Sequence, residues 1–198
     1  MFKKFLPLSI EGDWRANVSA LPDAIVSPIL LNWLFENGSL TQKLKSHCNE
    51  FSVKVLAKHQ RFMTPCEINT MLAAEHKGSD ADFAKQLVQV REVLLYCDDV
   101  PWVYAQTIMP LTDVPCSVEQ LIVLGEKPLG EIIFNQPGVK RSDIEVVYFE
   151  PDAQVCQLAL QLNQSVEHGL CGRRSMFSLD GYSLLVAEIF LPFSGLYS

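Results

Sequence analysis

Two charged residues lie inside strongly apolar stretches, and their chemistry is the first question that the sequence raises. Arg91 stands in "LVQVREVLLYC" and Glu188 in "SLLVAEIFLP". Burying an unpaired charge costs several kcal/mol, so each side chain needs a partner. One interpretation is structural: Arg91 pairs with a carboxylate on the next strand, and Glu188 pairs with Arg91, Arg173 or Arg174. The other is that Arg91 grips a ligand carboxylate, while Glu188 faces a dry cavity and exchanges a proton there.

Two predicted helix starts could add hydrogen-bond donors to such a site. In "SLTQKLKSHC", Ser39 precedes Gln42 by three positions, which is the spacing of a capping box, so Leu40 would carry a free amide. The start of "PLGEIIF" leaves the amide of Leu129 free in the same way. Helix starts bind carboxylates, although capping by Ser39 and water explains either helix taken alone. They form a site only if they converge on Arg91.

Other chemistries lack their motifs. The four histidines show no HxxxH or HExxH spacing and the six cysteines form no CxxC pair, so no metal site is predicted. There is no GxSxG motif and no phosphate-binding glycine loop. Arg173 and Arg174, next to Gly172, are typical of a solvated turn or a local salt bridge, with a lesser role in meeting an anionic ligand.

Charge and composition exclude several classes of protein. A net charge of -7 and a pI near 5.1 argue against a nucleic-acid surface. No apolar run approaches the ~18 residues of a membrane span, and the N-terminal segment is interrupted before a signal-peptide core could form. Scattered cysteines fit a reducing compartment. We therefore expect a cytoplasmic protein. No sequence pattern determines the oligomeric state, and a monomer is the expectation.

The elements that would position these residues are short helices and antiparallel strands. Alternating or continuous apolar patterns predict strands over 51–58, 87–97, 102–110, 142–150 and, around the turn Asp180-Gly181, two more within 173–192. One helix is predicted over 23–38, with Ile25, Ile29 and Trp33 on its apolar face and Gly38 as its stop. Three more are predicted over 39–48, 117–125 and 128–134, and Pro128 is the first position of the last. Residues 74–86 read as a loop.

No alternation of strand and helix supports a parallel sheet. We therefore expect a single α+β domain over residues 1–198, with an antiparallel sheet of about six strands, flanking short helices and a ligand cavity. Residues 1–20 form an N-terminal extension with no assigned role.

Three stretches in matched order carry a resemblance: "VREVLLYCDDVPWVYAQTIMP", "LGEKPLGEIIF" and "GLCGRRSMFSLDGYSLLVAEIFLP". Together they resemble the chorismate pyruvate-lyase family, from about Pro28 to Tyr197. The resemblance implies a carbon-oxygen lyase that splits chorismate into 4-hydroxybenzoate and pyruvate, the first committed step of bacterial ubiquinone biosynthesis. It also implies a six-stranded antiparallel sheet with an enclosed cavity, and neither metal nor cofactor.

The family's functional residues carry over to four positions. By analogy, Arg91 and the amides of Leu40 and Leu129 hold the ring carboxylate, and Glu188 meets the 4-hydroxyl, with Arg91 and Glu188 as the catalytic pair. On this interpretation the partner of Glu188 is a hydroxyl rather than an arginine. Any proton transfer by Glu188 has a direction that the sequence does not determine, and an enclosed cavity predicts slow product release.

Two departures from the family pattern concern the surroundings of the site. Cys171 stands where a tryptophan is expected before "GRRS", and the connection 151–168 is longer than usual.

Two alternatives remain open. Effector-binding domains of some bacterial transcription regulators resemble the same fold, which would make this a non-catalytic sensor of small aromatic acids. About twenty residues precede the first predicted helix, too few for the winged-helix domain of such regulators. A structural interaction protein would instead pair Arg91 with Glu188 and leave no cavity.

Overall fold

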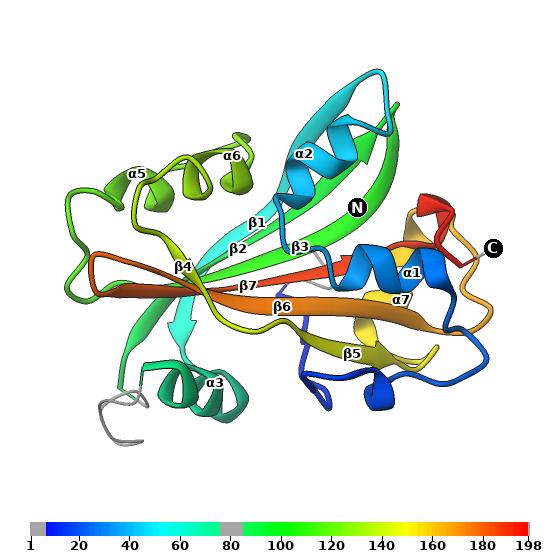
Figure 1. Cartoon of the computed structure of the whole chain (residues 1–198), viewed down its shortest axis with the longest axis horizontal. Coiled ribbons are helices and arrows are strands. Elements are labelled where there is room, and N and C mark those ends of the chain that lie inside the picture. The colour runs from blue at the N-terminus through cyan, green and yellow to red at the C-terminus, as the bar shows by residue number, and fades with distance from the viewer. Residues whose placement is uncertain (1–6, 76–84, 198) are drawn as a thin grey trace.

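The computed structural model describes residues 7–75 and 85–197, and its centre is one antiparallel sheet of seven strands (Figure 1). The strands are β1 (Phe51–Phe62), β2 (Leu87–Cys97), β3 (Val100–Pro110), β4 (Lys140–Arg141), β5 (Glu145–Phe149), β6 (Leu170–Leu179) and β7 (Tyr182–Phe190). Their order is β1-β2-β3-β7-β6-β4, and β5 also pairs with β6. The α+β class and the antiparallel sheet are confirmed; the strand beyond the predicted six is the two-residue β4.

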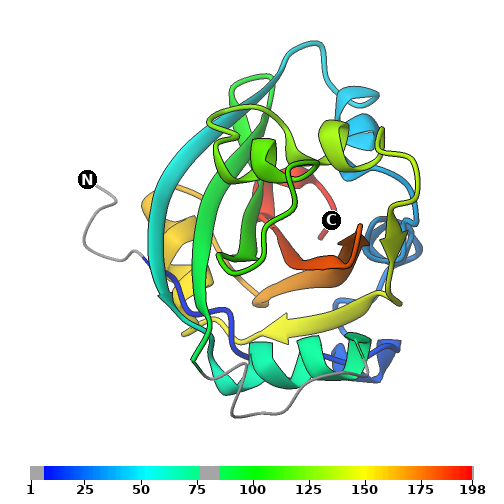
Figure 2. The ribbon, with the colours of Figure 1, turned by 90° about the vertical axis from the view of Figure 1, so that its left-hand side faces the viewer.

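The sheet is curved, and helices cover both of its faces (Figure 2). On the inner face lie α1 (Pro28–Leu34), α2 (Leu40–Lys45), α5 (Glu119–Ile122) and α6 (Leu129–Ile133). On the outer face lie α3 (Pro65–Glu75) and α7 (Gln154–Gln161). Two 3₁₀ turns, Val18–Ala20 and Pro192–Ser194, complete the described elements. Because both faces are covered, β2, β3, β6 and β7 are buried along almost their whole length.

Both predicted hairpins are present, and their turns have the backbone that a tight hairpin needs. Asp98 and Asp99 join β2 to β3 with φ of 48° and 63°, and Asp180 and Gly181 join β6 to β7 with φ of 52° and 80°. Two successive positive φ values give a twist that matches the strands they connect. Aspartate and glycine tolerate this conformation, so local sequence determined these two turns.

Several helix predictions need correction. The helix predicted over 23–38 begins only at Pro28, because Ser27 caps it through the amide of Leu30, and it ends at Leu34, before Gly38. Ile25 therefore precedes the helix, and Ile29 is 54% exposed rather than on its buried face. The helix predicted over 117–125 shortens to Glu119–Ile122, and Pro128 is the N-cap of α6 rather than its first residue.

The two helices of the outer face were not predicted. α3 follows β1 directly, and α7 lies in the long connection 151–168. Each packs apolar side chains against the outer face of the sheet, which the sequence pattern alone does not show. Of the loop predicted over 74–86, residues 76–84 lie outside the described part of the chain.

The N-terminal segment crosses the outer face of the sheet from residue 7 onward. Leu8 donates its amide to the buried carboxylate of Glu92 at 2.9 Å and accepts a hydrogen bond from Gln106 Nε2 at 3.1 Å. Arg15 then pairs with Val146 of β5 as an isolated bridge. Side chains of the sheet thus hold backbone groups of this segment, which gives part of the unassigned extension a place in the fold.

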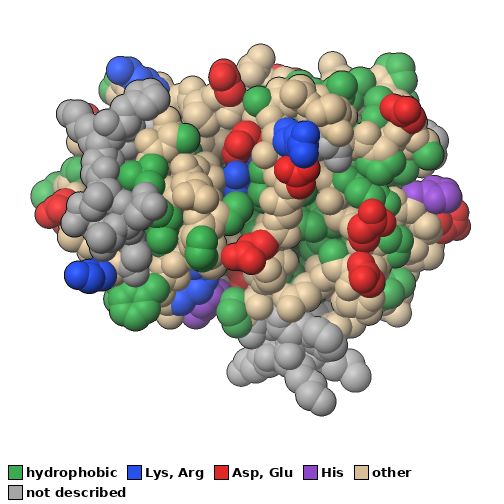
Figure 3. All heavy atoms as spheres, turned by 90° about the horizontal axis from the view of Figure 1, so that it is seen from below, with side chains coloured by type: hydrophobic (Ala, Val, Ile, Leu, Met, Phe, Trp, Pro, Cys, Tyr) green, Lys and Arg blue, Asp and Glu red, His purple; other side chains and the backbone are tan. Residues whose placement is uncertain are grey.

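The surface and the cysteines add two observations. On the face that carries α3 and β5, acidic side chains are scattered among apolar ones (Figure 3). All six cysteines lie in the described part and form no disulfide there; Cys97, Cys156 and Cys171 are buried, whereas Cys116 is exposed. Within residues 7–75 and 85–197, no helix has the length and apolar character needed to cross a membrane.

Candidate functional site

A pocket of about 580 Å³, including its open mouth, lies between the inner face of the sheet and the starts of α2 and α6. The four residues singled out in the sequence, Leu40, Arg91, Leu129 and Glu188, all line it. Most of the wall is apolar, contributed by Val53, Val93, Leu95, Ala105, Ile133, Phe134, Phe177 and Val186. The charged groups are therefore few and placed at particular points, as in a small-molecule site.

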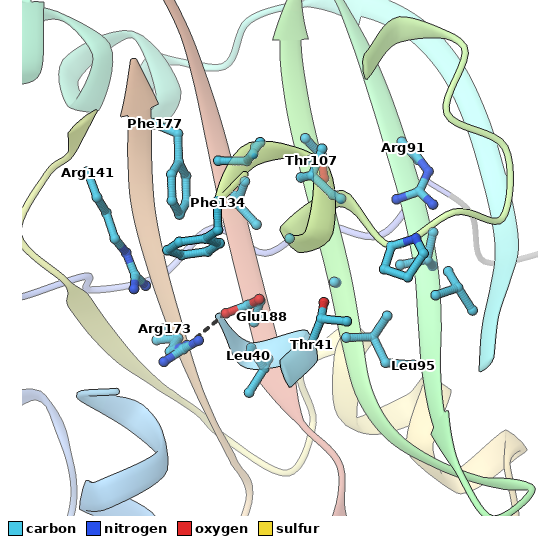
Figure 4. Close-up of a pocket in the computed structure, with 18 of the residues that line it drawn as sticks. Leu40, Thr41, Arg91, Leu95, Thr107, Phe134, Arg141, Arg173, Phe177 and Glu188 are labelled. Carbon is cyan, nitrogen blue, oxygen red and sulfur yellow. Dashed lines mark hydrogen bonds and ion pairs between the residues drawn. The ribbon is translucent and has the colours of Figure 1, made fainter. Parts of the chain in front are cut away.

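Strand register separates Arg91 from Glu188 while keeping both on the inner face. Arg91 lies opposite Thr107 of β3, whereas Glu188 lies opposite Ala105, two residues earlier on the same strand. Two strand spacings combined with two residues of offset place the two Cα atoms roughly 12 Å apart. The side chains stand on opposite sides of the pocket (Figure 4) and do not pair with each other.

Arg91 is 3% exposed, yet it contacts no carboxylate within the described chain. Its Nε and Nη2 donate to the carbonyl of Gly125 at 3.2 and 2.8 Å, and Nη2 also donates to the carbonyl of Lys127 at 3.1 Å. The ion pair considered from the sequence is therefore absent there. Burial without a nearby anion lowers the pKa of Arg91 to about 10. The remaining Nη1 donates to no described residue, so the guanidinium can take a further acceptor.

Glu188 has an arginine partner, which corrects the expectation that only a ligand hydroxyl would face it. Arg173 is its direct neighbour on β6, and Arg173 Nε donates to Glu188 Oε2 at 2.7 Å. Arg173 is 1% exposed and also donates from Nη1 to the carbonyls of Trp33 and Glu36. The pair holds the carboxylate in one orientation, and Glu188 Oε1 accepts no hydrogen bond from the described residues.

Arg173 and Arg174 are not in a solvated turn. They occupy successive positions of β6 and point to opposite faces of the sheet, where both are buried. Arg174 pairs with Glu145 at 2.7 Å and lies over the ring of Trp14 on the outer face. The alternative of a local salt bridge was therefore correct for each of them, with separate partners.

The starts of α2 and α6 lie together at the pocket wall. Ser39 caps α2 by accepting from the amide of Gln42, so the predicted cap is confirmed. A Cβ added at Gly130 would meet Thr41 Oγ1 at 2.8 Å, which shows how closely the two starts approach. No described residue accepts from the amide of Leu40 or Leu129, as is usual at a helix start. Arg91 contributes to this arrangement because it binds the carbonyls of Gly125 and Lys127, in the segment that leads into α6.

Of the charged residues of the pocket, Arg141 alone was missed from the sequence, and local sequence gives no signal for it. Arg141 belongs to the two-residue β4, and nothing in "GVKRSD" indicates that its side chain turns into a cavity. It lines the pocket beside Arg173 and Glu188 (Figure 4). Phe134 and Phe177, which stack edge to face at 5.6 Å, close the same side.

In the described part of the chain, no group of three or more His, Cys, Asp or Glu side chains is arranged so that it could hold a metal ion. The ionisable groups of the pocket are Arg91, Arg141, Arg173 and Glu188. Such a set suits an anionic ligand that also carries a hydrogen-bond donor.

Comparison with known proteins decides the family. The model of the family described as "Chorismate lyase" matches residues 17–198. This chain belongs to the chorismate lyase family. Curated relatives named "Probable chorismate pyruvate-lyase" support this membership. The relative from Shewanella sp. (strain ANA-3) is 41% identical over 185 residues, 93% of this chain and 89% of the relative. The relative from Pseudoalteromonas translucida (strain TAC 125) is 40% identical over 191 residues, 96% of this chain and 98% of the relative.

A solved structure supports the fold of this chorismate lyase family member. The effector domain of PhnF from Mycobacterium smegmatis matches with a TM-score of 0.53 at 15% identity, covering 78% of this chain and 88% of that domain. At this level of identity the likeness concerns the fold alone.

Proposed function

We propose that this chain is a chorismate pyruvate-lyase, which converts chorismate to 4-hydroxybenzoate and pyruvate as the first committed step of ubiquinone biosynthesis. Membership of the chorismate lyase family supports the reaction. The observation that carries the proposal is the polarised pocket: Arg91, buried without an anion, at one end and Glu188 at the other, with apolar walls between them.

The ring carboxylate of chorismate binds at the Arg91 end. The free Nη1 of Arg91 and the amides of Leu40 and Leu129 are donors there, and a carboxylate supplies the anion that Arg91 lacks. Charge-assisted hydrogen bonds are strong in a pocket whose walls are mostly apolar, so this end fixes the ring. The starts of α2 and α6 must keep their close packing for both amides to reach one carboxylate.

The 4-hydroxyl meets Glu188 at the other end. Arg173 holds Glu188 through Oε2, which leaves Oε1 to accept a hydrogen bond from the hydroxyl. The substrate loses its enolpyruvyl group from the ring carbon next to the one bearing this hydroxyl, and the ring becomes aromatic, which drives the reaction. The protein therefore contributes mainly by positioning and desolvating the substrate. The proposal also includes action in the cytoplasm, which the unpaired cysteines support.

The decisive experiment is incubation of the purified chain with chorismate without added metal. Ultraviolet absorbance and mass spectrometry would identify 4-hydroxybenzoate and pyruvate as the expected products. Arg91→Ala and Glu188→Gln test the two ends of the pocket, and unchanged turnover in both would remove the site assignment. If 4-hydroxybenzoate raises the melting temperature while chorismate is left unconverted, the chain is a sensor of aromatic acids instead.

A further inference from the structure

Arg141 is the second guanidinium of the pocket that contacts no carboxylate within the described chain. Its Nε donates to Ser175 Oγ at 3.0 Å, and its Nη1 donates to the carbonyls of Glu36 and Asn37, both at 3.2 Å. The guanidinium carbon lies 5.3 Å from the centre of the Phe177 ring. Nη2 donates to no described residue. The side chain is thus oriented by neutral groups and keeps one donor edge without a partner.

The charge of the pocket is unbalanced. Three guanidinium groups and one carboxylate line it, which leaves a net of two positive charges. Burial and the nearby charge of Arg173 lower the pKa of Arg141 to about 10, while Glu188 and Glu36 act in the opposite direction. Because Glu188 neutralises Arg173, the uncompensated charges are those of Arg91 and Arg141, and holding them in a partly buried site destabilises the empty protein. A ligand with two negative charges would offset this cost, and a single carboxylate would leave half of it.

The position of Arg141 selects which carboxylate it can reach. With the ring carboxylate at Arg91 and the hydroxyl at Glu188, a substituent on the ring carbon beside the hydroxyl must lie at the Glu188 end. Arg173 is at that end too, but it is 1% exposed and already donates to Glu188 and to two carbonyls. Arg173 Nη2, like Arg141 Nη2, donates to no described residue, so charge and exposure separate the two arginines. Glu188 neutralises Arg173, whereas Arg141 is half-buried and has no carboxylate partner in the described chain.

We propose that Arg141 binds the carboxylate of the enolpyruvyl group of chorismate and so distinguishes the substrate from the ring product. The inference rests on the proposed function. When the ether bond between ring and side chain breaks, its electron pair goes to the enolpyruvate oxygen. The ring carbon that bears the hydroxyl loses a proton, and the enolpyruvate takes one up to become pyruvate. Throughout this step the departing group keeps its carboxylate on Arg141, whereas 4-hydroxybenzoate has no group for Arg141 to bind.

Two unreactive ligands separate this role from a structural one. 3-(Carboxymethoxy)-4-hydroxybenzoate carries a carboxylate on an ether beside the hydroxyl, and 3-methoxy-4-hydroxybenzoate has the same ring and ether without it. Calorimetry on the unsubstituted protein should show the diacid binding at least about 10-fold more tightly. Arg141→Met should weaken the diacid about 10- to 100-fold and the methoxy acid less than about 3-fold. The KM for chorismate should rise in parallel with the loss of diacid binding.

The matched control is Arg174→Met, which removes a buried arginine from the other face of the sheet and should leave the preference for the diacid unchanged. Should Arg141→Met fail to fold, Arg141→Gln retains an amide donor for the carbonyls of Glu36 and Asn37 and gives the same comparison. Equal weakening of both ligands, or no preference in the unsubstituted protein, would overturn the role of Arg141. If the protein converts chorismate and still shows one of these results, only this inference fails; if it does not convert chorismate, the proposed function fails first.

Discussion

Replacing Arg91 with methionine tests whether this side chain is part of a structural ion pair or is a group that binds the carboxylate of a ligand. Arg91→Met keeps most of the buried volume and removes the charge. In the folded protein the pKa of Arg91 is lowered to about 10, so the charged form is less favourable there than in the unfolded chain. For a base this cost is fully present below about pH 10 and disappears as the pH rises from there through the higher pKa of Arg91 in the unfolded chain.

The size of the effect follows from opposing contributions. The lowered pKa of Arg91 corresponds to a destabilisation of the folded protein by roughly 2–3 kcal/mol, once screening by solvent is allowed for. Against this, the variant loses the hydrogen bonds to the carbonyls of Gly125 and Lys127, which contribute about 1–2 kcal/mol together. The free energy of unfolding at pH 7 should therefore be unchanged or higher than the unsubstituted value by up to about 2 kcal/mol. Removing one partner of a buried ion pair would instead cost about 3–5 kcal/mol.

The ligand response should change far more than the stability. At a 4-hydroxybenzoate concentration of 100 times its Kd, binding stabilises the unsubstituted protein by about 2.7 kcal/mol, or about 5–10 °C in Tm for a domain of this size. If Arg91 contributes about 3 kcal/mol to binding, the Kd of Arg91→Met rises about 100-fold. The same ligand concentration then adds only about 0.4 kcal/mol, or about 1 °C.

Urea unfolding and thermal melts with and without ligand measure both quantities. Arg15→Met is the control, because Arg15 is an exposed arginine in a surface pair with Asp13 and should change neither result. A stability loss of 3 kcal/mol or more in Arg91→Met would show that Arg91 has an anionic partner after all. A ligand shift of more than half the original would show that the carboxylate binds elsewhere.

Three further substitutions test other parts of the site and fold. Glu188→Gln keeps an oxygen acceptor for Arg173 but removes the charge that pairs with this buried guanidinium, so urea unfolding should show a loss of about 3 kcal/mol while turnover of chorismate per folded molecule falls about 100-fold; full activity would contradict the role of the carboxylate. In Gly130→Ala the new Cβ would collide with Thr41 and push the two helix starts apart, so calorimetry should give a Kd for 4-hydroxybenzoate about 10-fold higher, and an unchanged Kd would mean that the amides do not bind it. Gly169→Ala forces a side chain onto a residue with φ of +77° against a backbone carbonyl, and should cost about 2–3 kcal/mol of stability with normal turnover per folded molecule; a stability change below 0.5 kcal/mol would refute the strain.

Local sequence patterns determined six of the seven described strands, the two hairpin turns and the cap of α2. Each depends on neighbours within a few residues: alternating side chains, aspartate or glycine at positive φ, and a serine before the first free amides. Arg91 and Glu188 could also be identified, because a charge inside an apolar strand is conspicuous whatever it pairs with. The helices α3 and α7 were missed because they are stabilised by packing on the outer face of the sheet, a contact between segments far apart in the chain.

The partners of the charged residues were decided by the tertiary structure. Glu188 meets Arg173 because the register of β6 and β7 places them side by side, and Arg91 donates to carbonyls more than thirty residues away. Arg141 enters the pocket only because β4 pairs with the far end of β6. The sequence by itself determined which charged side chains must be buried. Only the folded chain decided what each charge contacts, because register and loop placement depend on the balance of many distant contacts.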